Sequence, residues 1–156
     1  MITAVDIIRA LSDLIETVTG EPPTTKDVTE GFDRPCTWVR PLFIRPEAAR
    51  GLQRDDLEIE IVYFAARSWK GWKTLLKVQA DLAAALTRPV PVSDTFLLYP
   101  EDLEFMPSRE DMTLTCTFSL ENFQLLPAPD VLLPDMEHLD YTMNDLELIA
   151  PANQNE

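Results

Sequence analysis

The segment from Met112 to Phe123 constrains the fold more than any other part of the chain. Apolar side chains alternate along it with threonine, serine and glutamate; the apolar set is Met112, Leu114, Cys116, Phe118 and Leu120. Because successive side chains of a strand point to opposite faces, this pattern predicts a long strand with one buried face and one polar face. Threonine fits the polar face, since its branched Cβ packs well on a pleated surface.

Two segments have the apolar spacing of amphipathic helices. The first is predicted over Thr3–Thr19, with Thr3 as the N-cap and Gly20 just past the end. The second is predicted over Lys70–Thr87, with Ser68 as a candidate N-cap. The side chains expected to face the core include Val5, Ile8, Leu11, Leu14, Ile15 and Val18 in the first helix and Trp72, Leu75, Leu76, Leu82 and Leu86 in the second.

Two apolar runs, Cys36–Ile44 and Asp55–Ala65, predict a long antiparallel hairpin. The first run is apolar on both faces, which favours a central strand, while Arg40 and Pro41 indicate a bulge or an edge segment. The connection between the runs, Arg45–Arg54, is polar and is expected to be a long loop.

Shorter strands are expected at Thr24–Val28, Phe96–Tyr99 and Leu103–Met106. The strands that follow the second helix are expected to complete the sheet as a meander. The predicted fold class is therefore α+β, a mostly antiparallel sheet with two helices packed on one face.

The net charge of −14 is distributed unevenly. Up to Arg109 the chain has 17 acidic and 13 basic residues, and after it 10 acidic residues and no Lys or Arg. Composition changes at Pro127, so we expect an α+β domain over residues 1–126 and an acidic, proline-containing C-terminal arm over residues 127–156. Two interpretations of the arm stay open, a contact with a neighbouring subunit and a flexible tail, and residues 151–156 are expected to be disordered.

The charge and the hydropathy exclude some partners. A chain this acidic is not expected to bind nucleic acid through its phosphates, which requires clustered Lys and Arg. No apolar run is long enough to span a bilayer, and no signal peptide is expected at the N-terminus.

No catalytic residue, metal site or cofactor is expected, because the sequence contains none of the usual motifs. The single histidine, His138, lies in the acidic arm, and neither a phosphate-binding glycine loop nor a C-x-x-C or H-E-x-x-H pattern occurs. Cys36 and Cys116 lie in apolar runs and are predicted to be buried and reduced. Glu58 and Glu60 share a strand face; we favour a solvated face there over a Mg²⁺ site.

Candidate contact residues fall into three groups, which combine charge with exposed apolar character. They are Arg45, Arg50 and Arg54 in the predicted loop, Trp69, Lys70 and Lys73 at the start of the second helix, and Met136, Leu139 and Tyr141 in the arm. Of Trp69 and Trp72, one is expected in the core and one at a rim. The loop is predicted either to dock a partner or to remain a solvated, mobile segment.

The chain resembles tail terminator proteins of long-tailed phages and of phage-derived tail-like elements of Gram-positive bacteria. The resemblance rests on the order of the predicted elements and on the run Glu30-Gly-Phe-Asp-Arg-Pro-Cys-Thr-Trp-Val39 that enters the first long strand. It also rests on Asp102-Leu-Glu-Phe105 followed by the alternating strand, and on Met136-Glu-His-Leu139. It covers residues 1–141, and the sequence departs from the family pattern in its acidic segment beyond Leu139.

The resemblance implies a structural protein without enzyme activity. Such proteins form a ring, commonly a hexamer, that caps the tail tube, stops its polymerisation and offers a joining surface to the head-side connector. The implied partners are copies of itself, the tail tube protein and the head–tail connector protein, with DNA only passing through the lumen and no membrane. The implied location is the host cytoplasm during assembly and then the virion tail or tail-like particle.

Other functions stay open from the sequence alone. One is a different head–tail joining or neck protein. Another is a small α+β ligand-binding or enzymatic domain that uses Cys36, Cys116 or the Glu58/Glu60 pair. A third is an adaptor that binds a basic partner through the acidic arm.

Overall fold

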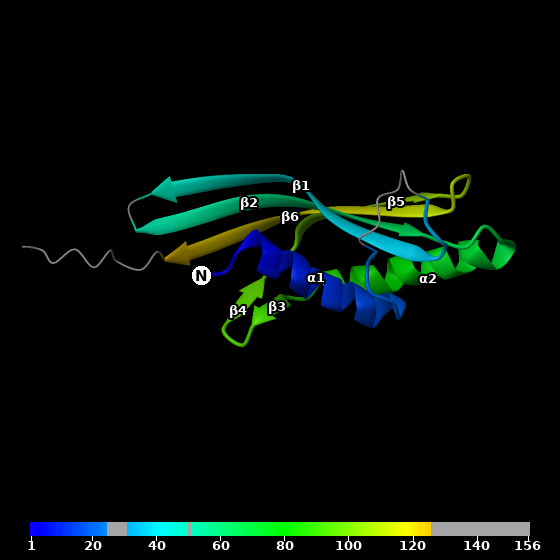
Figure 1. Ribbon diagram of the computed structural model, residues 1–156, viewed down its shortest axis with the longest axis horizontal. Coiled ribbons are helices and arrows are strands. Elements are labelled where there is room, and N and C mark those ends of the chain that lie inside the picture. The colour runs from blue at the N-terminus through cyan, green and yellow to red at the C-terminus, as the bar shows by residue number, and fades with distance from the viewer. Residues whose placement is uncertain (25–30, 50, 126–156) are drawn as a thin grey trace, which may run out of the picture.

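Six strands and two helices make up the computed structural model, which describes residues 1–24, 31–49 and 51–125. In chain order they are α1 (Ala4–Thr19), β1 (Cys36–Ala49), β2 (Leu52–Phe64), α2 (Trp69–Leu86), β3 (Val90–Ser93), β4 (Phe96–Leu98), β5 (Glu101–Ser108) and β6 (Thr113–Leu125). The main sheet has the order β1-β2-β6-β5, with every neighbouring pair antiparallel. Both helices lie against one face of this sheet (Figure 1), so the predicted α+β class is confirmed.

Local signals define both helices. Thr3 is the N-cap of α1, where its hydroxyl accepts a hydrogen bond from the Asp6 N–H and its own N–H donates to the Asp6 carboxylate over 2.9 Å. Gly20 ends the helix at φ 85°, in the left-handed region that favours glycine. Ser68 caps α2 by accepting from the Gly71 N–H at 3.2 Å. The predicted caps are therefore confirmed.

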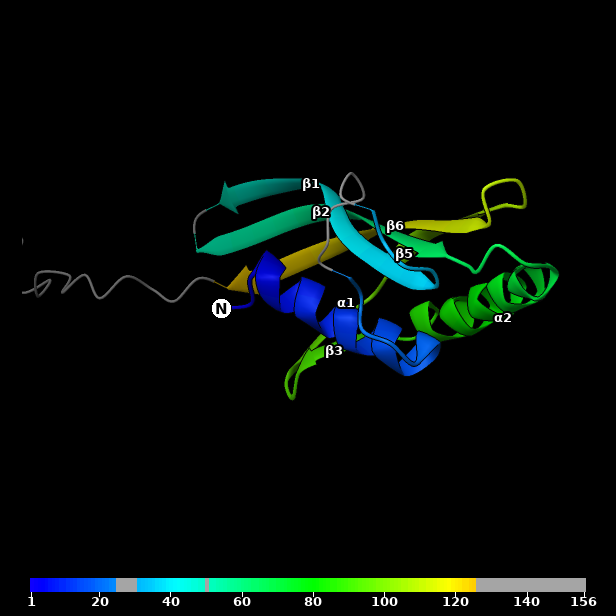
Figure 2. The ribbon, with the colours of Figure 1, turned by 45° about the vertical axis from the view of Figure 1, so that its right-hand side comes forward.

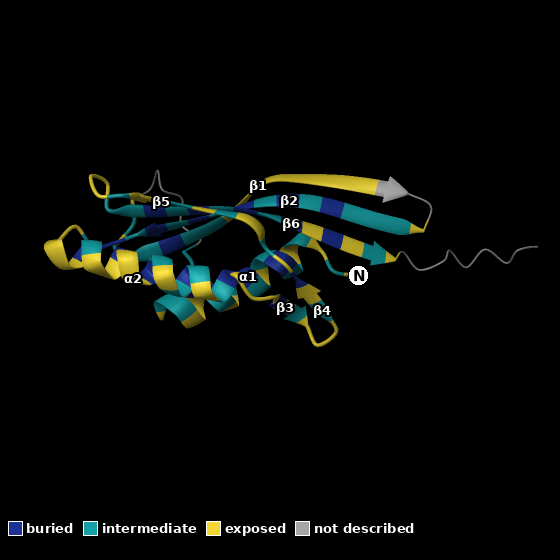
Figure 3. Ribbon diagram, turned by 180° about the vertical axis from the view of Figure 1, so that it is seen from behind, coloured by how far each residue is buried: buried dark blue, intermediate teal, exposed yellow. Residues whose placement is uncertain are grey.

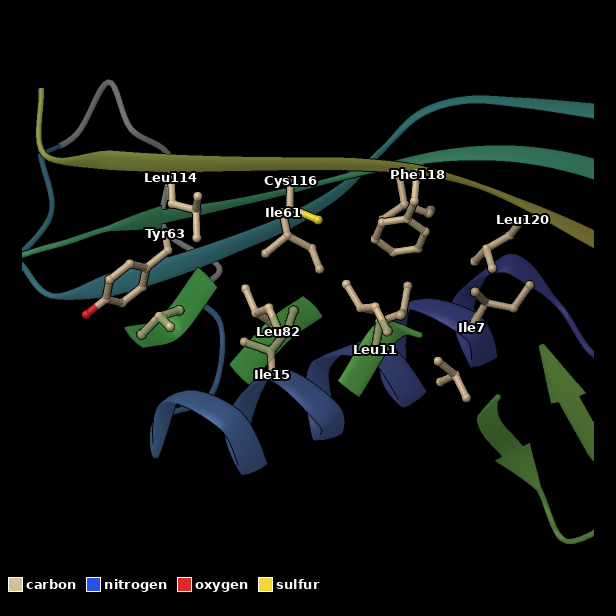
Figure 4. Close-up of a cluster of buried hydrophobic side chains, with 14 of the residues drawn as sticks. Ile7, Leu11, Ile15, Ile61, Tyr63, Leu82, Leu114, Cys116, Phe118 and Leu120 are labelled. Carbon is tan, nitrogen blue, oxygen red and sulfur yellow. The ribbon is translucent and has the colours of Figure 1, made fainter. Parts of the chain in front are cut away.

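The core lies between the sheet and the two helices. The close-up in Figure 4 shows β6 and β2 side chains pointing down toward those of α1 and α2; the labelled residues include Leu114, Cys116, Phe118 and Leu120 from β6, Ile61 and Tyr63 from β2, and Ile7, Leu11, Ile15 and Leu82 from the helices. The four β6 side chains are at most 1% exposed. The predicted buried face is thus confirmed from Leu114 to Leu120, whereas Met112 precedes the strand and is only partly buried. Burial raises the pKa of the Cys116 thiol to about 12.

The helix faces differ partly from the prediction. Val5 is 66% exposed whereas Ile7 is fully buried, because the buried stripe of α1 follows Ile7, Leu11 and Ile15 at four-residue steps. In α2, Leu76 is 43% exposed and Val78 takes the core position. Because apolar residues occur on several faces of each helix, the sequence does not determine which face is buried. Packing against the sheet determines it.

The first long strand is at an edge, so its prediction as a central strand was wrong. β1 pairs only with β2 among the described strands, and its register shifts between Pro41 and Phe43, which confirms the expected bulge. The predicted loop Arg45–Arg54 was also wrong: β1 continues to Ala49 and β2 begins at Leu52. Pairing with β2, which itself pairs along its whole length with β6, keeps this polar stretch extended.

The meander was predicted only in part. β5 joins the main sheet as expected, but β4 pairs with β3 in a separate two-stranded sheet. Thr24 is not in a strand, although its N–H donates to the Thr37 carbonyl over 2.8 Å. Residues 25–28 of the predicted strand Thr24–Val28, and the predicted C-terminal arm, lie outside the described residues.

Candidate assembly surfaces at the two ends of the sheet

The predicted contact residues lie at opposite ends of the sheet. Arg45 and Arg54 are near the tip of the β1–β2 hairpin, and Trp69, Lys70 and Lys73 begin α2 at the other end, as two views of the molecule show (Figures 1 and 2). Arg50, Met136, Leu139 and Tyr141 lie outside the described residues. The structure therefore offers two separate surfaces rather than one.

The first surface is the exposed part of edge strand β1 (Figure 3). Leu42, Phe43 and Ile44 are 43%, 44% and 45% exposed, three large apolar side chains in a row. Phe43 pairs with Glu58 on the helix-free face, while Ile44 pairs with the buried Leu57, so apolar surface is presented on both sides of the edge. We call Leu42–Ile44 the edge triplet; it was missed as a surface because the same composition predicts a central strand.

Two prolines frame the edge triplet. Pro41 and Pro46 have no N–H, so the outer edge of β1 lacks two hydrogen-bond donors. Prolines on an edge strand oppose uninterrupted pairing with another chain. A contact at this edge is therefore carried mainly by the side chains of the triplet.

The two described arginines near the hairpin tip differ in their partners. Arg54 Nε lies 2.9 Å from Asp56 Oδ1 and its Nη2 lies 2.6 Å from Glu121 Oε1. Arg45 instead lies over the Phe43 ring, 5.8 Å from its centroid, and has no ion-pair partner among the described residues. Of Arg45 and Arg54, the arginines near the tip that the structure describes, Arg45 is thus the one that remains available to a partner.

A buried polar network supports the hairpin end from the helix side. Asn122, fully buried, donates from Nδ2 to Asp55 Oδ2 at 3.2 Å and to the Ile2 carbonyl at 3.3 Å. Gln124 accepts from the Ile2 N–H and donates to the Ile2 carbonyl, both over 2.6 Å, and Gln53 donates to Asp55. The N-terminus is therefore tied to β2 and β6 beneath the hairpin, where polar groups need these partners.

The second surface is formed by the first turn of α2 and the turn before β6. Trp69 is 79% exposed with Lys70 Nζ 5.5 Å from its ring centroid, and Arg109 Cζ lies 6.0 Å from the Trp72 ring centroid. Trp72 itself packs partly against the core, as expected for one of the two tryptophans. We call Arg67, Trp69, Lys70, Trp72, Lys73 and Arg109 the basic–aromatic patch.

The backbone of the first turn of α2 packs directly against the backbone of Ala66 beneath this patch. Gly71 is buried, and a Cβ at this position would lie 1.9 Å from the Ala66 carbonyl oxygen. Only glycine lets the first turn of α2 approach residue 66 this closely. The positions of the patch side chains on α2 are therefore set by a rigid contact.

The carboxylates predicted as an alternative metal site are used differently. Arg40 Nε lies 2.6 Å from Glu60 Oε2, and Glu58 lines a shallow hollow of about 330 Å³ with Asp102 and Glu104. In the part of the chain that is described, no group of three or more His, Cys, Asp and Glu side chains could hold a metal ion. The Glu58/Glu60 pair therefore gives no support to Mg²⁺ binding.

A larger open groove, about 550 Å³, lies between α1 and the β3 segment. It is lined by apolar groups such as Leu14, Val18 and Val90, and at its edge Arg9 Nη1 lies 3.6 Å from Asp6 Oδ1. Neither cysteine lines it. The groove would suit an apolar ligand, but nothing in its lining resembles a reaction centre.

No protein-family model and no curated protein sequence matches the chain at a significant level. Among the described residues, no helix has both the length and the hydropathy that a membrane span requires.

Proposed function

We propose that this chain is a structural assembly protein that closes into a ring of identical copies, and that the ring is a phage tail terminator. The observation that carries the proposal is the edge triplet, a row of large apolar side chains on an open sheet edge. Exposed apolar surface on an edge strand is costly for a monomer and is characteristic of protein–protein contacts.

The sheet topology is compatible with head-to-tail addition of copies. Along the order β1-β2-β6-β5 each strand is antiparallel to its neighbour, so β1 and β5 also run in opposite directions. The β1 strand of a second copy in the same orientation would therefore run antiparallel to β5. Contacts that use two different surfaces in this way close into rings when the rotation between copies permits it.

The terminator role itself rests on the family resemblance and on charge. The proposed ring, a hexamer by that resemblance, caps the tail tube, ends polymerisation of the tube protein and presents a face to the head–tail connector. DNA passes through the lumen, and a chain with a net charge of −14 does not retain a polyanion by electrostatic attraction. No enzyme activity, metal or cofactor is part of the proposal.

Deleting the gene in a cell that assembles the particle tests the terminator role. Electron micrographs are expected to show tail tubes of unregulated length that lack heads. Complementation with the chain restores normal length, whereas complementation with Ile44→Lys does not, because a charge on the edge triplet opposes its burial. Val5→Lys, an exposed apolar position on α1, is the matched control and restores length. Tubes of normal length without the chain would refute the terminator role.

A different neck or joining protein is the second candidate. Such a protein would use the same edge triplet and would also form a ring, so these features do not distinguish the two candidates. The deletion experiment does. Loss of the neck component leaves tubes of set length without heads, whereas loss of a terminator changes the length itself.

A further inference from the structure

We infer that the basic–aromatic patch binds the acidic C-terminal segment, Pro127–Glu156, of a second copy of this chain. The inference deepens the proposed function, since it names a contact between neighbouring ring subunits. It rests on three observations: cations without acidic partners, a complementary segment of known length, and their placement at opposite ends of the fold.

The cations of the patch are not neutralised within the described structure. Arg67, Lys70, Lys73 and Arg109 make no ion pair with a described carboxylate, whereas Arg40, Arg54 and Lys77 each do. Glu110 and Asp111 follow Arg109 in the same turn and reduce the local positive charge without removing it. In a chain of net charge −14, an uncompensated group of cations beside an exposed tryptophan predicts an acidic partner with apolar side chains.

The C-terminal segment has that chemistry. It contains seven Asp or Glu residues and neither Lys nor Arg, and its acidic residues are interleaved with apolar ones; the apolar ones include Leu132, Leu133, Met136, Leu139, Tyr141 and Met143. Carboxylates can pair with the lysines and arginines while Met136, Leu139 or Tyr141 covers the Trp69 ring. The predicted contact residues of helix and arm thus belong to one interface.

The placement favours a second copy over the same chain. The segment follows Leu125 at one end of β6, and Arg109 lies just before the other end (Figure 1). Thirteen residues of strand separate these ends by about 40 Å, at roughly 3.3 Å per residue. To reach the patch of its own chain, the acidic segment would have to run back along the molecule. On the helix-free face it would then pass the hollow lined by Glu58, Asp102 and Glu104, whose negative charges repel it.

A second copy removes that obstacle. In copies joined edge to edge in the same orientation, the patch of the neighbouring copy lies at the far end of its sheet, about 40 Å along the strands at roughly 3.3 Å per residue. The 31 residues after Leu125 reach up to about 100 Å when extended, so the segment can follow the junction between copies to that patch without crossing the acidic hollow of its own sheet.

Site-specific photo-crosslinking of the full chain tests the inference. Trp69 is replaced by p-benzoylphenylalanine, which keeps an aromatic ring in the patch, and unlabelled chain is mixed in equal amount with heavy-isotope-labelled chain. After irradiation, mass spectrometry is expected to find crosslinks from position 69 to residues 127–156, including pairs of mixed isotope. The same probe at Leu97, an exposed position on β4 outside the patch, gives no such crosslinks.

Charge reversal supplies the second readout. Lys70→Glu/Lys73→Glu in the probe-bearing chain, or high salt, is expected to abolish the crosslinks, because the contact between exposed charges is screened and reversed. Arg88→Glu, a single charge reversal beyond the other end of α2, leaves them intact. Crosslinks confined to one isotope, or crosslinks that never reach residues 127–156, would each overturn the inference.

The outcome is separable from that of the tube-length experiment. Regulated tubes that depend on the chain, without crosslinks to the segment, would reject this contact and leave the terminator role standing. Crosslinks of mixed isotope in a chain whose deletion leaves tube length unchanged would support this contact and reject the terminator role.

Discussion

At the scale of single residues, local chemistry explains what the sequence predicts well. At the start of each helix, the side chain of Thr3 or Ser68 accepts a hydrogen bond from a backbone N–H that has no partner within the helix. At the end of α1, Gly20 adopts the left-handed backbone conformation. Such interactions involve residues three or four apart, so the sequence contains all the information they need. The choice between Val5 and Ile7 as core residue could not be predicted in the same way, because the contact lies with strands far along the chain.

The two cysteines provide a prediction at this scale. Cys116 is fully buried, and burial raises its pKa to about 12, whereas Cys36 is only partly buried, with its pKa also raised by burial. Since the thiolate is the reactive form, we expect a thiol reagent near neutral pH to modify Cys36 in the native protein and Cys116 only after denaturation. Cys36→Ser should therefore be unreactive until it unfolds. Equal labelling rates for both thiols in the native wild-type chain would contradict the described core.

At the scale of elements, the sequence predicts where strands and helices form better than it predicts which of them lie next to one another. The alternation in β6 and the helical spacing in α1 and α2 are intrinsic to each segment, so these elements form where predicted. The edge position of β1 could not be predicted, because an apolar strand buried in a sheet and one that presents an interface have the same composition. The stretch Arg45–Arg54 has the polar composition of a loop, and pairing with β2 overrides it.

The polar network beneath the hairpin provides a prediction about how elements are joined. Asn122→Ala removes donors to Asp55 and to the Ile2 carbonyl, so a buried carboxylate and a backbone carbonyl lose partners. We expect the free energy of unfolding to fall by about 1–3 kcal/mol, measured by urea denaturation. Hydrogen exchange should also increase in the first turn of α1. Thr115→Ala, on the polar face of the same strand, is the control; an equal effect there would show that the network has no special role.

At the scale of the whole molecule, the described residues present two exposed surfaces, and no group of side chains among them could hold a metal ion. The two helices cover the middle of one face of the sheet, while the edge triplet and the basic–aromatic patch are exposed at separate places. In the ring that we propose, the edge triplet of one copy meets the β5 edge of the next copy and the patch binds a neighbour's acidic segment, so neither surface remains exposed. The sequence predicted Trp69, Lys70 and Lys73 as contact residues, but it did not predict the edge triplet or the place of Arg109 beside Trp72, since these depend on which segments meet in the fold.

Native mass spectrometry of the purified full-length chain over increasing concentration tests this central claim most directly. Closure into a ring predicts a single large assembly of defined copy number that replaces the monomer, shows a central hole in electron micrographs, and is lost in Ile44→Lys but kept in Val5→Lys. A chain that remains monomeric at every concentration, or one that grows without limit into open fibres, would contradict it.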